Sequence, residues 1–270
     1  MKITFIGGGN MASALIGGML AGSRDAPGIS VVDPDAMSRE RVAQRFGIAT
    51  FERADATALA CDVVVLAVKP QQMPAVAKEI APVLRGQLVI SVAAGIRSAD
   101  LSRWLDGHAR IVRTMPNTPA LIGEGITALV GAPGLAAADR DVAETIMRAA
   151  GQTLWVDDES MIDAVTAISG SGPAYVFFFM EAMQAAAQTM GFDEVQARQL
   201  TLATFAGASR LAVSSEDPPA VLREKVTSKG GTTAAALAVL VEHGVQARIA
   251  EAIEAARRRS AELGDEFGRS

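Results

Sequence analysis

The chain has 270 residues, of which 50% are hydrophobic and only 4% are aromatic, so any core has to be built mainly from Ala, Val, Leu and Ile. A net charge of −5 argues against a nucleic-acid partner, because binding to phosphates needs a basic surface. The single cysteine, Cys61, cannot form an internal disulfide, and His108 and His243 have no cysteine cluster beside them. We therefore expect a cytoplasmic protein of about two domains with no metal site.

The first predicted strand, residues 2–6, runs directly into a glycine turn and then into a helix. The turn reads G-x-G-x-x-A, and in this setting its glycines let a pyrophosphate approach the helix N-terminus. Ala12, the last residue of the motif, keeps the helix close to the sheet. The residues predicted to contact a dinucleotide here are Gly7, Gly8, Gly9, Asn10 and Met11.

The second predicted strand, residues 29–32, ends at Asp33. An acidic residue at this place can accept hydrogen bonds from the ribose hydroxyls of a dinucleotide, although a turn or cap residue before Pro34 is the alternative. Asp33 would repel the 2′-phosphate of NADP, a repulsion that Arg39 or Arg41 could offset. The sequence therefore predicts NADP or NAD as cofactor without deciding between them.

Strands and helices continue to alternate up to residue 158. The predicted strands are 63–68, 88–92, 110–113, 126–130 and 152–156, and the predicted helices are 35–46, 54–60, 73–84 and 136–150. The strand 63–68 is almost wholly apolar, which is typical of a parallel sheet covered on both faces. In such a sheet ligands bind beyond the carboxyl ends of the strands. Further cofactor contacts are therefore expected at Ala67, Val68, Lys69, Pro70, Ala93, Ala94 and Gly95.

The second half of the chain has the pattern of helices only. The predicted helices are 162–168, 173–190, 194–213, 220–226, 233–243 and 245–263. Residues 164–180 carry no charge, but the interruptions at Gly170, Gly172 and Pro173 favour a buried helix over a membrane span. Phe177, Phe178 and Phe179 occupy three sides of one turn, so that helix has to be covered all round, and we expect a second copy of the chain to cover it. Val245, Ile249 and Ile253 are predicted to form one buried stripe.

The expected architecture is an α/β Rossmann-type N-terminal domain, residues 1–158, followed by an all-α dimerisation domain, residues 159–270.

Residues 226–233, which we call the Gly-Thr loop, join two predicted helices. Two adjacent glycines and several hydroxyl side chains converge there on a helix N-terminus, a geometry that suits a small anion. The alternative is a plain helix connection capped by Thr232 or Thr233.

Five segments together resemble the pyrroline-5-carboxylate reductase family in order and spacing: residues 7–12, 67–70, 115–119, 163–175 and 226–233. The resemblance implies reduction of L-1-pyrroline-5-carboxylate to L-proline by NADPH or NADH, the last step of proline biosynthesis. It also implies homodimers that often assemble into larger rings. The implied contacts to the substrate are Ser228, Gly230, Gly231 and Thr232, with Thr233 as the catalytic residue at the ring nitrogen. Many members have proline where this chain has Lys229.

Reduction of a cyclic imine mainly requires that two rings be positioned and the nitrogen be satisfied, which fits a sequence without a placed histidine base or paired carboxylates. A hydroxy-acid dehydrogenase would need a catalytic lysine in the helical half, where only Lys225 and Lys229 are available. A catalytically silent dinucleotide-binding regulator is a further alternative. Glu159 and Asp163 either face the site or belong to a solvated helical turn.

Overall fold

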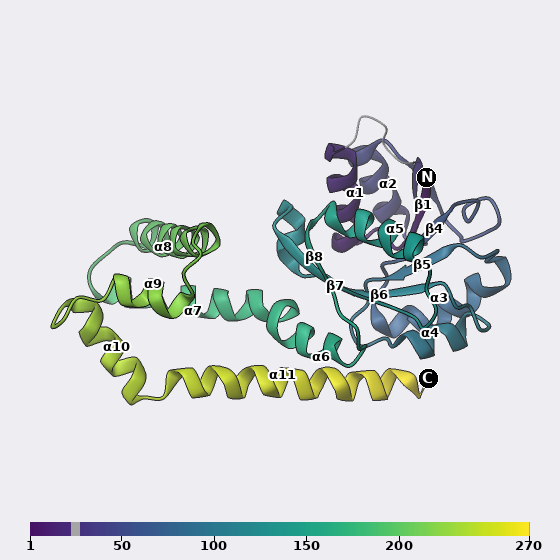
Figure 1. Ribbon diagram of the computed structural model, residues 1–270. Coiled ribbons are helices and arrows are strands. Elements are labelled where there is room, and N and C mark those ends of the chain that lie inside the picture. The colour runs from purple at the N-terminus through teal and green to yellow at the C-terminus, as the bar shows by residue number, and fades with distance from the viewer. Residues whose placement is uncertain (23–27, 270) are drawn as a thin grey trace. The chain divides into compact units, whose positions relative to one another are not determined.

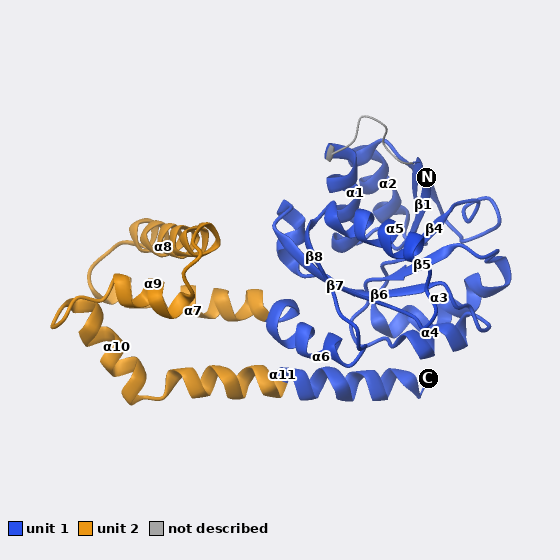
Figure 2. Cartoon of the chain, viewed as in Figure 1, with its two compact units in different colours: residues 1–171, 256–270 blue, residues 172–255 orange. Residues whose placement is uncertain are grey.

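The computed structural model describes residues 1–22 and 28–269, which form two compact units (Figures 1 and 2). Unit 1 contains the described residues of 1–171 and 256–270, and unit 2 contains residues 172–255. The predicted domain boundary at residue 158 lies earlier than this division. The reason is that α6 (Met161–Val165) still packs on the sheet, where Ile162 is buried with Met115 and Val130.

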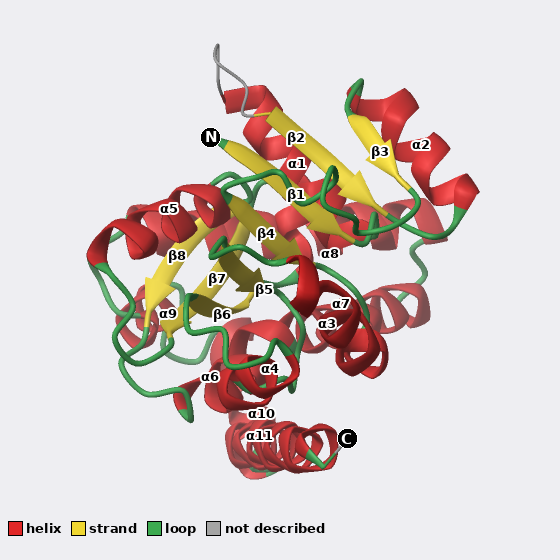
Figure 3. Ribbon diagram, turned by 90° about the vertical axis from the view of Figure 1, so that its right-hand side faces the viewer, coloured by secondary structure: helices red, strands yellow, loops and turns green. Residues whose placement is uncertain are grey.

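Unit 1 is built on a sheet of eight strands among the described residues, in the order β3-β2-β1-β4-β5-β6-β7-β8 (Figure 3). Neighbouring strands run parallel except for β6 and β7. The strands are β1 (Lys2–Ile6), β2 (Gly28–Val32), β3 (Ala49–Phe51), β4 (Val63–Leu66), β5 (Leu88–Ser91), β6 (Ile111–Met115), β7 (Gly125–Gly131) and β8 (Gly151–Trp155). The predicted parallel-dominated Rossmann-type sheet is confirmed.

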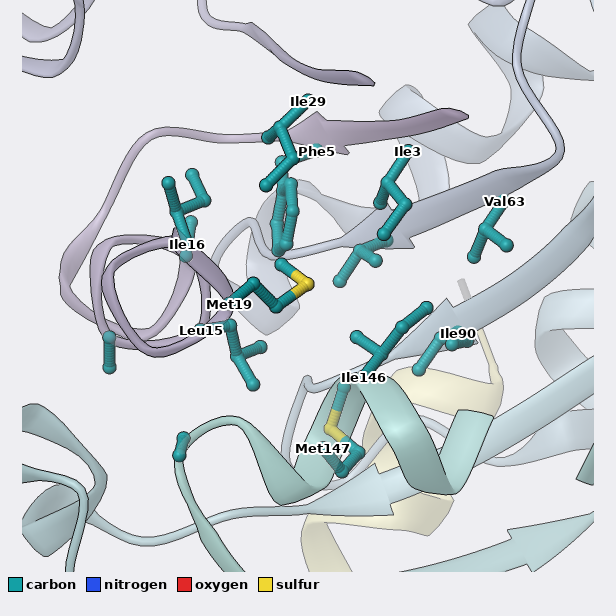
Figure 4. Packing of buried hydrophobic residues seen from close by; sticks show 14 of the residues in the cluster. Ile3, Phe5, Leu15, Ile16, Met19, Ile29, Val63, Ile90, Ile146 and Met147 are labelled. Atoms are coloured by element: carbon teal, nitrogen blue, oxygen red, sulfur yellow. The ribbon is translucent and has the colours of Figure 1, made fainter. Parts of the chain in front are cut away.

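Helices cover both faces of this sheet. In β4, Val63 and Val65 join one apolar cluster while Val64 and Leu66 join the other, because successive side chains of a strand point to opposite faces. The first cluster is covered by α1 (Asn10–Gly22), α2 (Ala36–Phe46) and α5 (Ala137–Arg148), and the second by α3 (Met73–Ile80) and α4 (Ser98–Trp104). Figure 4 shows Leu15, Ile16 and Met19 of α1 in the first cluster, together with residues of the strands and α5.

One predicted helix is absent, and two observed elements were not predicted. Residues 54–60 form a turn and not a helix: Asp55 caps one helical turn, in which the Leu59 N–H donates to the Asp55 carbonyl at 2.9 Å, and the bonding then tightens, with the Ala60 N–H donating to the Thr57 carbonyl at 3.3 Å. The strand β3 and the helix α4 were not predicted. Both are short, and β3 is paired only through β2 at the sheet edge.

Unit 2 consists of α7 (Gly172–Thr189), α8 (Glu194–Ser214), α9 (Pro219–Lys225), α10 (Thr232–Glu242) and the first part of α11 (Val245–Gly268). Its helices expose large apolar side chains: Phe177 and Phe178 are 57% and 68% exposed, and Ile249 is 38% exposed. The predicted burial of the three phenylalanines and of the Val245–Ile249–Ile253 stripe is thus not achieved within one chain. Met161–Thr189 is the one helical stretch among the described residues that is long and apolar enough to cross a membrane by length and composition.

Candidate active site

A cleft of about 930 Å³ lies beyond the carboxyl ends of the central strands of unit 1. The strand order places the ends of β2, β1, β4 and β5 side by side, so segments distant in sequence meet there. All predicted cofactor residues except Gly95 line it: Gly7, Gly8, Gly9, Asn10, Met11, Asp33, Ala67, Val68, Lys69, Pro70, Ala93 and Ala94. The sequence predicted this set from the glycine turn and from the ends of the following strands.

The glycine loop, residues 7–11, is shaped to bring backbone donors to the cleft. Gly7 has φ of +99°, its N–H donates to the Val32 carbonyl at 2.8 Å, and a Cβ at this position would lie 2.8 Å from the Ala67 carbonyl oxygen. A Cβ on Gly9 would meet nothing within 4 Å, so this residue leaves space on the cleft side. The first N–H groups of α1 have no acceptor within the helix, as in other helix N-termini, and they suit a pyrophosphate.

Asp33 both binds the glycine loop and lines the cleft. Its Oδ2 accepts from the Gly8 N–H and from the Ser38 hydroxyl, both at 2.9 Å, and its Oδ1 accepts from the Asp35 N–H at 2.9 Å. The carboxylate therefore fixes the second glycine while it lines the cleft wall. This position is the one from which an acidic residue recognises ribose hydroxyls in dinucleotide-binding folds.

The arginines that the sequence offered as partners for a 2′-phosphate are placed differently. Arg39 donates to the carbonyl oxygens of Asp33 and Pro34, at 2.7 and 2.9 Å, and Arg41 donates to the Ser38 hydroxyl at 3.2 Å. Neither lines the cleft, whereas Arg53 does. Arg53 follows β3, the strand that was not predicted, which is why sequence reasoning missed it. Other lining residues without a sequence signal are Glu52, Gln72, Val76 and Glu79.

Gly95 is the exception among the predicted cofactor residues. It is buried with φ of +73°, and the Phe267 ring lies 3.2 Å from where its Cβ would stand. Gly95 therefore faces the end of α11 and does not line the cleft.

The Gly-Thr loop lies in unit 2, between α9 and α10. Gly230 has φ of +71°, the Gly231 N–H donates to the Ser228 carbonyl at 3.0 Å, and Gly231 is the N-cap of α10 without a side-chain cap. The predicted alternative, a cap by Thr232 or Thr233, is wrong. Both threonines instead stand in the first turn of α10, at the positive end of the helix.

Other polar residues singled out in the sequence have structural partners. Glu159 accepts from the Ser98 N–H at 2.7 Å and forms an ion pair with Arg113 at 2.9 Å. Asp163 accepts from the Ser260 hydroxyl at 2.7 Å. Lys225, one of the two lysines that a hydroxy-acid dehydrogenase would require, is paired with Asp217.

The comparisons with known proteins identify the family. The family described as pyrroline-5-carboxylate reductase dimerisation matches residues 159–263, and the family described as NADP oxidoreductase coenzyme F420-dependent matches residues 2–95. Pyrroline-5-carboxylate reductase of Pseudomonas aeruginosa is 46% identical over 268 residues, which cover 99% of this chain and 98% of that protein. The chain belongs to the pyrroline-5-carboxylate reductase family.

Solved structures extend this similarity to the whole fold. A pyrroline-5-carboxylate reductase from Coxiella burnetii has a TM-score of 0.91 and 40% identity, with 97% of this chain and 98% of that chain covered. The enzyme from Plasmodium falciparum, solved with NADP bound, has a TM-score of 0.86 and 29% identity, with 98% of each chain covered. The predicted architecture, a Rossmann-type domain followed by a helical dimerisation domain, is confirmed.

Proposed function

We propose that this chain reduces L-1-pyrroline-5-carboxylate to L-proline by hydride transfer from NAD(P)H, the last step of proline biosynthesis. A reduced nicotinamide supplies the hydride when it is bound, so the protein has to bind, orient and desolvate. The cleft of unit 1 fits such a cofactor. The glycine loop can pack closely on the Ala67 carbonyl because Gly7 has no Cβ, and the first N–H groups of α1, which lack an acceptor within the helix, lie beside the cleft.

The substrate carboxylate is proposed to bind at the Gly-Thr loop. The single observation that carries this assignment is the uncapped N-terminus of α10, where Gly231 provides no side-chain cap. An anion at this end would accept hydrogen bonds from N–H groups that lack a partner within the helix, and the helix dipole would stabilise its charge. Ser228, Gly230, Gly231 and Thr232 are the proposed contacts.

Thr233 is proposed as the catalytic residue. Its side chain is half-buried in the first turn of α10. There the hydroxyl oxygen can accept a hydrogen bond from the ring N–H once the imine is protonated. The bond is stronger to the positively charged, protonated nitrogen than to the neutral imine, so it favours the protonated form that accepts the hydride at carbon.

The test is Thr233→Val, measured by the oxidation of NADPH and of NADH with pyrroline-5-carboxylate. Loss of a hydrogen bond to a charged nitrogen costs about 1.5–3 kcal/mol, which corresponds to a fall in kcat of roughly 10- to 150-fold. Thr227→Val is the matched control in the same loop, because the Thr227 hydroxyl donates to the Arg223 carbonyl at 2.6 Å. An unchanged kcat for Thr233→Val, or an equal loss in the control, would remove Thr233 from this role.

The apolar surface of unit 2 is proposed to be covered by a second copy of the chain, as a homodimer that can assemble into a larger ring. The exposed phenylalanines lie within the segment that matches the dimerisation family. This assignment also accounts for the apolar stretch Met161–Thr189 without a membrane. We place the protein in the cytoplasm, with a small-molecule substrate and no nucleic-acid partner. Sedimentation as a monomer at micromolar concentration would contradict the dimer.

A further inference from the structure

The loop of residues 93–98 has two sides with different neighbours. Ala93 and Ala94 line the dinucleotide cleft, whereas Gly95 is buried against the C-terminal end of α11. Both the loop and this end of α11 belong to unit 1. A wall of the cleft is therefore backed by a segment more than 160 residues away in sequence.

Phe267 makes the central contact of this segment. Its ring lies 3.2 Å from the position of a Cβ on Gly95, and it packs against the apolar cluster that contains Ala93 and Ile96. The positive φ of Gly95, +73°, lets the loop turn over the ring without a side chain between them. The ring thus sets how far the loop can move away from the cleft.

Polar contacts fix the same segment on both sides of the ring. Arg97 forms an ion pair with Asp265 at 2.7 Å, and Arg103 donates to the Gly268 carbonyl at 2.7 Å. Gly264 is buried beneath the Arg97 guanidinium, and a Cβ there would lie 3.0 Å from Nε. The approach of α11 to the loop is therefore close and specific, and not a loose apposition of two surfaces.

We propose that the C-terminal end of α11, residues 260–268, positions the loop of residues 93–98 and through it one wall of the dinucleotide cleft. Phe267 is the main positioning residue, and Asp265 supports it through Arg97. The proposal rests on the cofactor role of the cleft stated above. It predicts that loosening this segment weakens dinucleotide binding and leaves the affinity for the imine substrate unchanged.

The charged pair should matter less than the ring. The side chains of Arg97 and Asp265 are 41% and 57% exposed, so their attraction is screened by water. Phe267 instead fills space next to the loop backbone, with the Leu263 Cβ as the next neighbour of the Gly95 position at 3.4 Å. Loss of the Phe267 ring should therefore raise the dinucleotide dissociation constant more than loss of the Asp265 charge.

The experiment uses the full chain and measures the dissociation constants of NADPH and NADH by fluorescence titration without substrate, and then the KM values of dinucleotide and substrate. We expect Phe267→Ala to raise the dinucleotide dissociation constant by about 3- to 30-fold and Asp265→Asn by about twofold or less. In each variant the KM for pyrroline-5-carboxylate should change by a smaller factor than the dinucleotide dissociation constant does. Phe267→Leu keeps part of the apolar bulk and should raise the dissociation constant by an intermediate factor of about 2- to 5-fold, so it decides the proposal if the alanine variant fails to fold.

Leu135→Ala is the control for loss of apolar packing. Leu135 packs against the core near Gly131, at the end of β7 that pairs with the amino end of β6, away from the cleft. It should lower the melting temperature without changing the dissociation constant. The proposal is overturned if Phe267→Ala and Phe267→Leu bind dinucleotide like the unmodified chain, or if Leu135→Ala weakens binding equally. If the unmodified chain binds dinucleotide but does not turn over pyrroline-5-carboxylate, the proposed function fails and these dissociation constants still decide the inference.

Discussion

The pair Arg113–Glu159 gives a sharp prediction, because its two members differ in burial. The side chain of Arg113 on β6 is 4% exposed, whereas that of Glu159 is 31% exposed. Arg113 donates from Nη1 to Glu159 at 2.9 Å, and its Nε has no hydrogen-bond partner among the residues that the structure describes. Glu159 also accepts from the N–H and the hydroxyl of Ser98, at 2.7 and 3.1 Å. Removal of Glu159 therefore leaves a buried guanidinium, whereas removal of Arg113 leaves a partly solvated carboxylate.

Glu159→Gln leaves a buried guanidinium without its counter-charge, which costs about 3 kcal/mol, the lower end for a broken buried pair because Glu159 is partly solvated. Arg113→Met leaves a carboxylate that still accepts from Ser98 and reaches water, so we expect a loss of about 1 kcal/mol. The double variant should be more stable than Glu159→Gln alone, since it no longer contains an isolated buried charge.

Thermal and urea unfolding at one fixed protein concentration measure these differences, because a dimer makes the melting temperature depend on concentration. For a chain of this size, Glu159→Gln should lower the melting temperature by about 6–10 °C. The reasoning is refuted if Arg113→Met costs more than Glu159→Gln, or if the double variant is the least stable of the three.

Three further predictions concern the cleft and the surface. Gly7→Ala should weaken dinucleotide binding roughly tenfold or more, measured by titration, because φ of +99° and the nearby Ala67 carbonyl exclude a Cβ; normal affinity would contradict the tight-turn geometry. Asp33→Ser should shift the NADPH-to-NADH rate ratio toward NADPH by roughly tenfold, since it removes a negative charge near a 2′-phosphate; an unchanged ratio would mean that Asp33 acts only on the glycine loop. Asp139→Asn should cost about 0.5–1 kcal/mol at pH 7, because hydrogen bonds from Arg110 lower the pKa of Asp139 below its ordinary 3.8. A group with a lowered pKa stabilises the folded state above its ordinary value and loses this contribution as the pH falls through the lowered pKa, so the difference between the two proteins in urea unfolding should shrink as the pH falls below 3.8.

Local patterns sufficed for the elements that the sequence predicted well. The apolar run of β4 and the strand–glycine–helix order around Gly7 each carry their signal within a few residues. The failures occurred where elements are short. The helical bonding of residues 54–60 ends after a single turn, and β3 has three residues at the sheet edge.

The residues of the candidate site also fall into those that a local pattern predicts and those that it does not. Strand ends can be predicted to converge because parallel strands place their carboxyl ends at one edge, and this rule located Asp33, Lys69 and Ala93 at the cleft. It could not locate Arg53, which depends on an unpredicted strand. It also could not identify which side of the loop of residues 93–98, after β5, faces the cleft. For Gly95 the same rule gave the right loop and the wrong side.

The position of Gly95 is decided by a residue that no local pattern connects with it. A glycine after a strand is compatible with a cofactor contact, a tight turn or a close approach of another element. Here the second and third apply, because Gly95 has φ of +73° and Phe267 occupies the space beside it. The helical repeat of residues 245–263 predicted a helix but gave no reason for its extension to Gly268, and this extension carries Asp265 and Phe267. The last turns of α11 thus do not need to be inside the cleft to influence it: by filling the space behind the loop, they fix where its other side can stand.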